Sequence, residues 1–177
     1  MKKALLAITL GALCVSSFAQ GKDLKVAIDP TYEPFTFKTP DGKPTGFDVE
    51  IAQALCEQIK RKCVFVEQVW DSMIAGLMAR KYDVIISSMS VTEERQKQID
   101  FTDKYYNTPT GIIGSKDAKF DATPEGLSGK IIGVQGSTVH EAYAKKHFGE
   151  TAAEIKVYQT QDEAQSDLAA GRIDAVQ

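Results

Sequence analysis

The sequence predicts an α/β fold with largely parallel sheets. Short apolar strands alternate with segments of helical periodicity along almost the whole chain, which is typical of sheets connected by helices. The stretch from Tyr82 to Ile86 is apolar apart from Asp83, as expected for a parallel strand that is covered on both faces. The same alternation continues through the second half of the 177-residue chain, so the prediction applies to both halves.

In the first half, the apolar runs predict strands at residues 24–28, 63–66 and 82–86. A helix is indicated where apolar side chains recur at every fourth position, namely Phe47, Ile51, Leu55 and Ile59. Asp71 stands where it can cap a second helix, which would carry Ile74, Leu77 and Met78. A short polar helix is expected to begin at Thr92.

In the second half, strands are predicted at residues 111–114, 131–134, 155–158 and 173–176. One helix should follow Gly136-Ser137-Thr138 and run to about Phe148. Another is expected from Thr160 to Ala170, with Gly171 as the residue that ends it.

The first twenty residues have the three parts of a secretory signal peptide. Lys2 and Lys3 form a positive start, Ala4 to Val15 is mainly apolar, and small residues precede a cleavage point after Ala19. A membrane anchor is the alternative, but the run is shorter than the ~20 apolar residues of a spanning helix. A lipid anchor on Cys14 is disfavoured because the large Leu13 precedes it. We therefore expect a periplasmic protein with residues 1–19 removed.

Charge and cysteine content narrow the function classes. The formal charge is −3, and it becomes −5 without the leader, which carries two lysines and no acid. An acidic surface binds phosphate backbones poorly, so nucleic acid is not an expected partner. Cys56 and Cys63 remain after cleavage, and an even pair in an exported chain predicts a disulfide. Two free thiols, one of them buried, are the alternative.

The end of the sequence is unusual. The chain stops at Gln177, directly after an apolar strand pattern and without a polar tail. Because natural termini usually lie at the surface, we expect a truncated sequence, the alternative being a short domain that ends there.

Four motifs occur in one order along the chain. They are Asp29-Pro30-Thr31-Tyr32-Glu33-Pro34-Phe35, Gly46-Phe47-Asp48, Ile86-Ser87-Ser88-Met89-Ser90-Val91-Thr92-Glu93-Glu94-Arg95 and Gly133-Val134-Gln135-Gly136-Ser137-Thr138. Together they resemble the family 3 solute-binding proteins of ABC importers, in particular the lysine/arginine/ornithine- and histidine-binding branch. The resemblance implies the two-lobe periplasmic binding protein fold (type II), with the ligand held between the lobes. It places lobe one at residues 20–109 and lobe two at 110–177, so that the chain ends inside lobe two and the return segment to lobe one is absent.

A carboxylate site is predicted around Arg95, because a guanidinium matches the geometry of the ligand carboxylate. The resemblance gives Arg95 this role, although on composition alone it could be a surface arginine. Hydroxyls cluster just upstream at the end of a parallel strand, where ligands bind. They belong to Ser87, Ser88, Ser90 and Thr92. A hydroxyl-rich loop that only caps a helix is the alternative for this segment.

The resemblance implies that Thr138 faces the ligand carboxylate from lobe two. Gly136-Ser137-Thr138 follows a strand and opens a helix, so that free N–H groups and the helix dipole favour an anion. Helix capping and ligand binding are compatible here. The next residues, Val139-His140-Glu141, depart from the branch, which has a glutamine and one residue fewer, so His140 receives no role.

Tyr32 and Trp70 are predicted to be aromatic walls around the ligand side chain, although aromatic residues are more often part of a core. Asp29 follows the first strand directly, and the resemblance implies that it meets the distal cation of the ligand. A turn formed with Pro30 is its structural alternative, and Glu33 is a second acid that could share the task.

Signatures of common enzymes and of metal sites are absent from the sequence. It contains no G-x-S-x-G, H-E-x-x-H or P-loop motif, and only two histidines, of which His147 is expected to be solvated. We expect no catalytic residue, no cofactor and no metal. The predicted function is capture of a cationic L-amino acid by a monomeric binding protein, which delivers it to the membrane permease of an ABC importer. Binding of glutamine, histidine or an opine, a periplasmic dehydratase of the same fold, and a receptor sensory domain are the alternatives.

Overall fold

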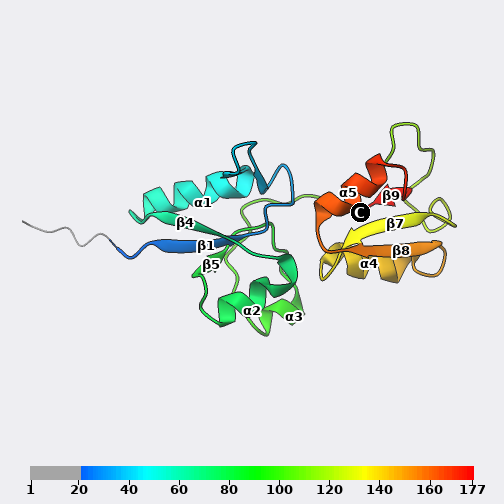
Figure 1. The fold of residues 1–177 in the computed structure, drawn as a ribbon. Helices are drawn as coiled ribbons and strands as arrows, with labels where there is room; N and C mark the ends of the chain where they lie inside the picture. The colour runs from blue at the N-terminus through cyan, green and yellow to red at the C-terminus, as the bar shows by residue number, and fades with distance from the viewer. Residues whose placement is uncertain (1–20) are drawn as a thin grey trace, which may run out of the picture.

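The computed structural model describes residues 21–177, which form two main sheets with helices packed against them and a small two-stranded sheet (Figure 1). The predicted leader, its cleavage point after Ala19, and Cys14 lie outside the described residues. Within residues 21–177, no helix is long and apolar enough to cross a membrane.

The first sheet has the strand order β4-β1-β5, and both of its strand pairs are parallel. Its strands are β1 (Leu24–Ile28), β4 (Cys63–Glu67) and β5 (Val84–Ile85). Its helices, with a preceding 3₁₀ turn η1, are α1 (Phe47–Gln58), η1 (Trp70–Ser72), α2 (Met73–Met78) and α3 (Glu93–Gln96). A small antiparallel hairpin of β2 (Phe37–Lys38) and β3 (Pro44–Thr45) precedes α1.

Both faces of the first sheet are covered, as the apolar strand pattern predicts. Val26 and Ile28 pack with Val49 and Ala52 of α1, while Ala27 points the other way, into a cluster with Met73 and Tyr82. Figure 1 shows α1 on one side of this sheet and α2 on the other. The period-two alternation of β1 therefore supplies one side chain set to each helix layer.

The buried face of α1 differs from the predicted stripe. The exposed fractions of Phe47, Leu55 and Ile59 are 41%, 50% and 51%, whereas Val49, Ala52 and Cys56 are buried. The reason is geometric: positions four apart drift around a helix of 3.6 residues per turn, whereas a 49–52–56 spacing stays on one face. Small side chains on that face also let α1 approach the sheet closely.

The start of α2 also differs from the prediction. Trp70–Ser72 form the 3₁₀ turn, so the helix begins at Met73 and Ser72 occupies its N-cap position. Asp71 lies inside the turn and does not cap α2. Strand β5 is shorter than the apolar run 82–86, because only Val84 and Ile85 pair with β1.

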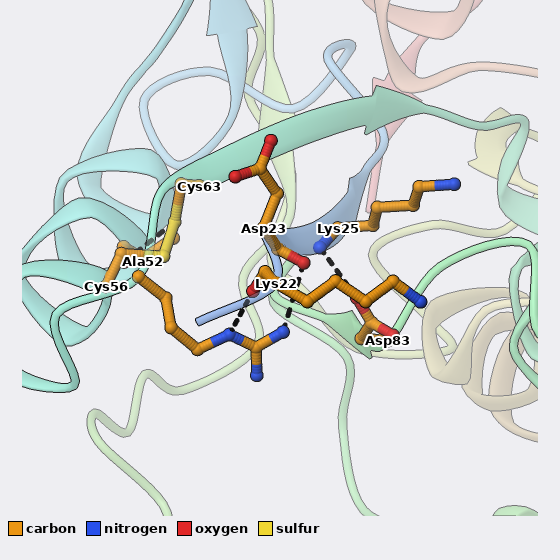
Figure 2. The surroundings of a disulfide bond; sticks show 8 residues. Lys22, Asp23, Lys25, Ala52, Cys56, Cys63 and Asp83 are labelled. Atoms are coloured by element: carbon orange, nitrogen blue, oxygen red, sulfur yellow. Dashed lines mark hydrogen bonds between the residues drawn. A yellow bond between two sulfur atoms is a disulfide. The ribbon is translucent and has the colours of Figure 1, made fainter. Parts of the chain in front are cut away.

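The predicted Cys56–Cys63 disulfide is confirmed (Figure 2). It joins the last turn of α1 to the first residue of β4, with 5.8 Å between the Cα atoms. Close by, the Arg61 Nε donates to the carbonyl of Lys22 at 2.6 Å, and its Nη2 donates to the carbonyl of Asp23 at 3.0 Å. The loop between α1 and β4 is thus attached to the segment that leads into β1.

The second sheet has the order β6-β9-β7-β8. Its strands are β6 (Ile113–Gly114), β7 (Ile131–Gln135), β8 (Glu154–Tyr158) and β9 (Ala175–Val176), and its helices are α4 (Val139–Phe148) and α5 (Gln161–Ala169). Strand β7 pairs in parallel with β8 and β9, whereas β6 runs antiparallel to β9. The chain passes from the first sheet to the second between α3 and β6 (Figure 1).

Local sequence signals account for the helices of the second sheet. Thr138 caps α4 by accepting a hydrogen bond from the Glu141 N–H, and Thr160 and Glu163 form a reciprocal capping box at the start of α5. Gly171, which follows the C-cap residue Ala170 of α5, has a φ of 69°, the left-handed conformation expected of a glycine that ends a helix. Both helices therefore begin at the carboxyl end of a parallel strand of this sheet.

Candidate functional site

A cavity of about 40 Å³, called the polar cavity below, lies where the carboxyl ends of β1, β5 and β7 face one another. It is lined by Asp29, Tyr32, Trp70, Ser87, Ser88, Ser90, Arg95, Gln135, Thr138, Val139 and His140. The structure thus brings together eight of the residues that the sequence predicts for the ligand site. Thr92, from the predicted hydroxyl cluster, is not among the lining residues; its hydroxyl caps α3 by accepting a hydrogen bond from the Arg95 N–H at 3.2 Å. The sequence reasoning did not find Gln135, Val139 and His140, although all three adjoin the Gly136-Ser137-Thr138 motif.

The serine loop after β5 is held by a buried carboxylate. Asp48, at the start of α1, is fully buried and accepts hydrogen bonds from the hydroxyls of Ser88 at 2.7 Å and Tyr105 at 2.8 Å. Burial raises the pKa of Asp48, and the two hydrogen bonds oppose that shift. Ser88 has a φ of 52°, and Ser87 accepts a hydrogen bond from the Asp29 N–H at 3.0 Å. Asp48 therefore fixes the shape of a loop that lines the cavity. Its only signal in the sequence was its place in the Gly46-Phe47-Asp48 motif.

Arg95 bridges the two sheets across the cavity. Its Nη1 donates to the carbonyl of Ser90 at 2.8 Å, and its Nη2 donates to the carbonyl of Ser137 at 3.2 Å. The guanidinium carbon lies 5.4 Å from the ring centroid of Trp70, and burial lowers the pKa of Arg95. The Ser137 carbonyl also accepts a hydrogen bond from the Trp70 Nε1 at 3.0 Å. One backbone oxygen, from the turn between β7 and α4, thus accepts from Arg95 Nη2 and Trp70 Nε1, two donors that a ligand carboxylate could use.

Asp29 gives the polar cavity a negative charge as well. Asp29 is 4% exposed, and its carboxylate accepts from the Thr31 hydroxyl at 2.8 Å and from the Gln135 Nε2 at 2.9 Å. Asp162, in the first turn of α5, has a raised pKa, first because of burial and then because of the negative charges of Asp29 and Glu33. Asp29 lines the cavity and Asp162 lies near enough to interact with its charge, so this region can attract a cation.

A larger cavity of about 410 Å³ runs along the open edge of β5 and is called the edge cavity. Residues 83–91 and 99–108 line it together with Leu55 and Leu77, so it is built from the first sheet and the connecting segment. The polar cavity is the better candidate for recognition of a small molecule, because polar groups from both sheets converge there. Within residues 21–177, no group of three or more metal-binding side chains comes together.

Comparison with known proteins places the chain in a family. The family described as bacterial extracellular solute-binding proteins, family 3, matches residues 24–152. The chain belongs to this family. The predicted resemblance is therefore confirmed, and the α/β architecture is that of the two-lobe periplasmic binding proteins. In the following, lobe one contains the first sheet and lobe two the second.

Two relatives of this family 3 chain are an L-arginine-binding protein of Pseudomonas aeruginosa, 43% identical over 178 residues, and a histidine-binding periplasmic protein of Escherichia coli, 41% identical over 180 residues. Each alignment covers 99% of this chain and 69% of the relative. An ancestral arginine-binding protein bound to arginine is a structural neighbour, with a TM-score of 0.83, 36% identity, and coverage of 88% of this chain and 69% of the other. A further structural neighbour is an ancestral arginine-binding protein bound to glutamine, with a TM-score of 0.81, 36% identity, and coverage of 88% of this chain and 68% of the other.

Proposed function

We propose that this family 3 protein captures a cationic L-amino acid between its lobes and delivers it to the permease of an ABC importer. The observation that carries this proposal is the polarity of the cavity. Arg95 and the start of α4 offer donors to the cavity, while Asp29 offers it a negative charge, and Asp162 lies near enough to Asp29 for their charges to interact. A cationic amino acid has a carboxylate at one end and a cation at the other, which complements this arrangement.

Each predicted site residue has a place in this proposal. Arg95, Ser90 and Thr138 would hold the ligand carboxylate, with Ser87 and Ser88 shaping the loop beside it. Tyr32 and Trp70 would form walls around the aliphatic part, and Asp29 would meet the distal cation. The names of the relatives, which bind arginine or histidine, support a cationic ligand.

Binding requires a rearrangement of the lobes. Ligand pockets typically hold roughly 300–1,000 Å³, far more than the 40 Å³ between the lobes here. An entering ligand would have to part the lobes and replace the Ser137 carbonyl at Arg95. We place the lobe boundary at residues 109 and 110, since the first sheet uses residues 24–85 and the second residues 113–176.

We further propose that the protein acts in the periplasm as a monomer, after removal of residues 1–19. The periplasmic names of relatives support this location. A binding protein presents a closed, loaded cleft to its permease, so no catalytic residue, cofactor or metal is needed for this task.

The glutamine complex of the ancestral neighbour favours one second candidate, a binding protein for glutamine. Calorimetric titration with arginine, lysine, ornithine, histidine and glutamine distinguishes the candidates, and mass spectrometry under non-denaturing conditions identifies any ligand that copurifies. Tighter binding of glutamine than of every cationic amino acid would refute the preference proposed here. Loss of water from a cyclic amino acid on incubation would instead indicate a dehydratase.

A further inference from the structure

His140 lies in the polar cavity in an unusual state. Its ring lines the cavity beside Thr138 and Val139, at the second position of α4. The Nδ1 atom is buried and has no hydrogen-bond partner among the described residues. Because an unpaired buried polar atom is costly, native structures rarely keep one without a reason.

The surroundings of His140 favour an anion next to it. Arg95 is near enough for its positive charge to act on the imidazole, and both lie at the end of the cavity where α4 begins with its positive dipole. The carboxylates nearby are already engaged: Asp29 accepts from Thr31 and Gln135. On α4 itself, the Glu141 carboxylate accepts from the Ser137 N–H at 2.6 Å and from Lys145 at 2.6 Å.

Building on the proposed function, we propose that His140 contacts the α-carboxylate of the bound amino acid and donates to it through Nδ1. The carboxylate would then lie between Arg95 of lobe one and His140 of lobe two, and it would accept a hydrogen bond from the buried Nδ1 of His140. This assigns a ligand role to a residue at which the chain departs from the binding-protein branch that it resembles.

A dependence of binding on pH follows. In the unliganded protein, burial and the charge of Arg95 lower the pKa of His140, so the ring is neutral near pH 7. A carboxylate beside it offsets both effects and raises that pKa in the complex. Binding should therefore take up protons, and affinity should rise as pH falls from about 7.5 to 5.5. The other charged or titratable groups that line the cavity are Asp29, Tyr32 and Arg95.

The test is calorimetry of L-arginine binding at pH 5.5, 6.5 and 7.5, in buffers of different ionisation enthalpy. His140→Leu should weaken binding roughly tenfold or more, the expected effect of losing a hydrogen bond to a charged group. His140→Gln keeps a donor and should restore most of the affinity, but it should abolish the proton uptake. His147→Gln is the matched control, since His147 is exposed two turns along the same helix, where its ring centroid lies 4.1 Å from that of Tyr143.

The outcomes separate this inference from the proposed function. If His140→Leu binds L-arginine with the affinity and the proton uptake of the wild type, the role of His140 is overturned and the proposed function stands. Affinity that falls with decreasing pH would overturn it as well, because a histidine that accepts from the ligand ammonium must stay neutral. Failure of the wild-type chain to bind any amino acid would overturn both.

Discussion

Asp29→Asn tests whether one buried carboxylate sets the preference for a cationic ligand. Asp29 is buried at the end of β1, and it already accepts hydrogen bonds from Thr31 in lobe one and from Gln135 in lobe two. Asparagine has nearly the same shape but removes the negative charge. It also places an amide group opposite the Gln135 amide, which donates to the carbonyl of Gln159 at 3.3 Å as well. The substitution therefore has a charge effect and a hydrogen-bond effect.

Comparison of two ligands separates the two effects. A hydrogen bond to a charged group contributes about 1.5–3 kcal/mol, so the affinity for L-arginine should fall roughly 10- to 150-fold. The disturbed contact with Gln135 changes the free energy of lobe closure, so it should lower the affinities for L-arginine and L-glutamine by the same factor. The diagnostic quantity is thus the ratio of the two affinities, measured by calorimetry in the same buffer.

Thr31→Val is the matched control for this experiment. It removes the hydroxyl that donates to Asp29 at 2.8 Å and leaves the charge in place. The ratio of arginine to glutamine affinity should then stay near the wild-type value. An equal loss for both ligands in Asp29→Asn would show that Asp29 is structural, and Glu33 would become the next acid to test.

Three further substitutions test the site and its supports. Arg95→Ala should weaken the binding of every amino acid by about 2–5 kcal/mol. A near wild-type affinity in calorimetry would show that Arg95 does not belong to the site. Replacing Cys56 and Cys63 by serine should lower the free energy of unfolding by about 2.4 kcal/mol, given their separation of seven residues; an unchanged urea midpoint would contradict this. Tyr105→Phe removes a hydrogen-bond donor to Asp48 and should therefore raise the pKa of Asp48 further. Because ionisation of Asp48 then costs more in the folded state, the free energy of unfolding should fall more steeply than in the wild type as pH rises above about 4. Equal pH slopes in urea unfolding would exclude that coupling.

Several local features could be predicted from the sequence because their causes are local. Thr138 and Thr160 each precede a helix and cap it, and Gly171 follows α5 in the left-handed conformation. The hydroxyls of Ser87 and Ser88 follow a parallel strand, and the carboxyl ends of such strands meet at one edge of the sheet. In these cases, neighbouring residues are enough to determine the geometry.

Other features depend on how distant segments meet. Gln135 donates a hydrogen bond to Asp29, which is 106 positions away in the sequence. The charge of Asp29 raises the pKa of Asp162 only because the two lobes face each other. No local pattern contains that information, so neither Gln135 nor Asp162 was predicted for the site. The predicted apolar stripe that includes Leu55 is not the buried face of α1, for a related reason. The sequence shows which positions of α1 are apolar, but which of them are buried depends on how the helix packs on the sheet.

The fluorescence of Trp70 can report whether a ligand carboxylate replaces the Ser137 carbonyl at Arg95, as proposed. It is the single tryptophan of the chain, and its Nε1 donates across the cavity to the Ser137 carbonyl. A ligand carboxylate that replaces this carbonyl should change the environment of the indole, so its fluorescence should change and saturate with added L-arginine. Constant emission while calorimetry registers binding would argue that Trp70 lies outside the rearranged region.

Trp70→Phe and Trp70→Ala separate the two roles of this side chain. Phenylalanine keeps an aromatic wall but loses the N–H group, and with it a contact that stabilises the unliganded, closed arrangement. Because a ligand competes with that arrangement, the affinity of Trp70→Phe for L-arginine should stay near wild type or rise by up to about tenfold, the value of one neutral hydrogen bond. Alanine removes the wall and should weaken binding. An equal loss in both variants would mean that the N–H group contacts the ligand itself, and that the Ser137 carbonyl does not compete with it.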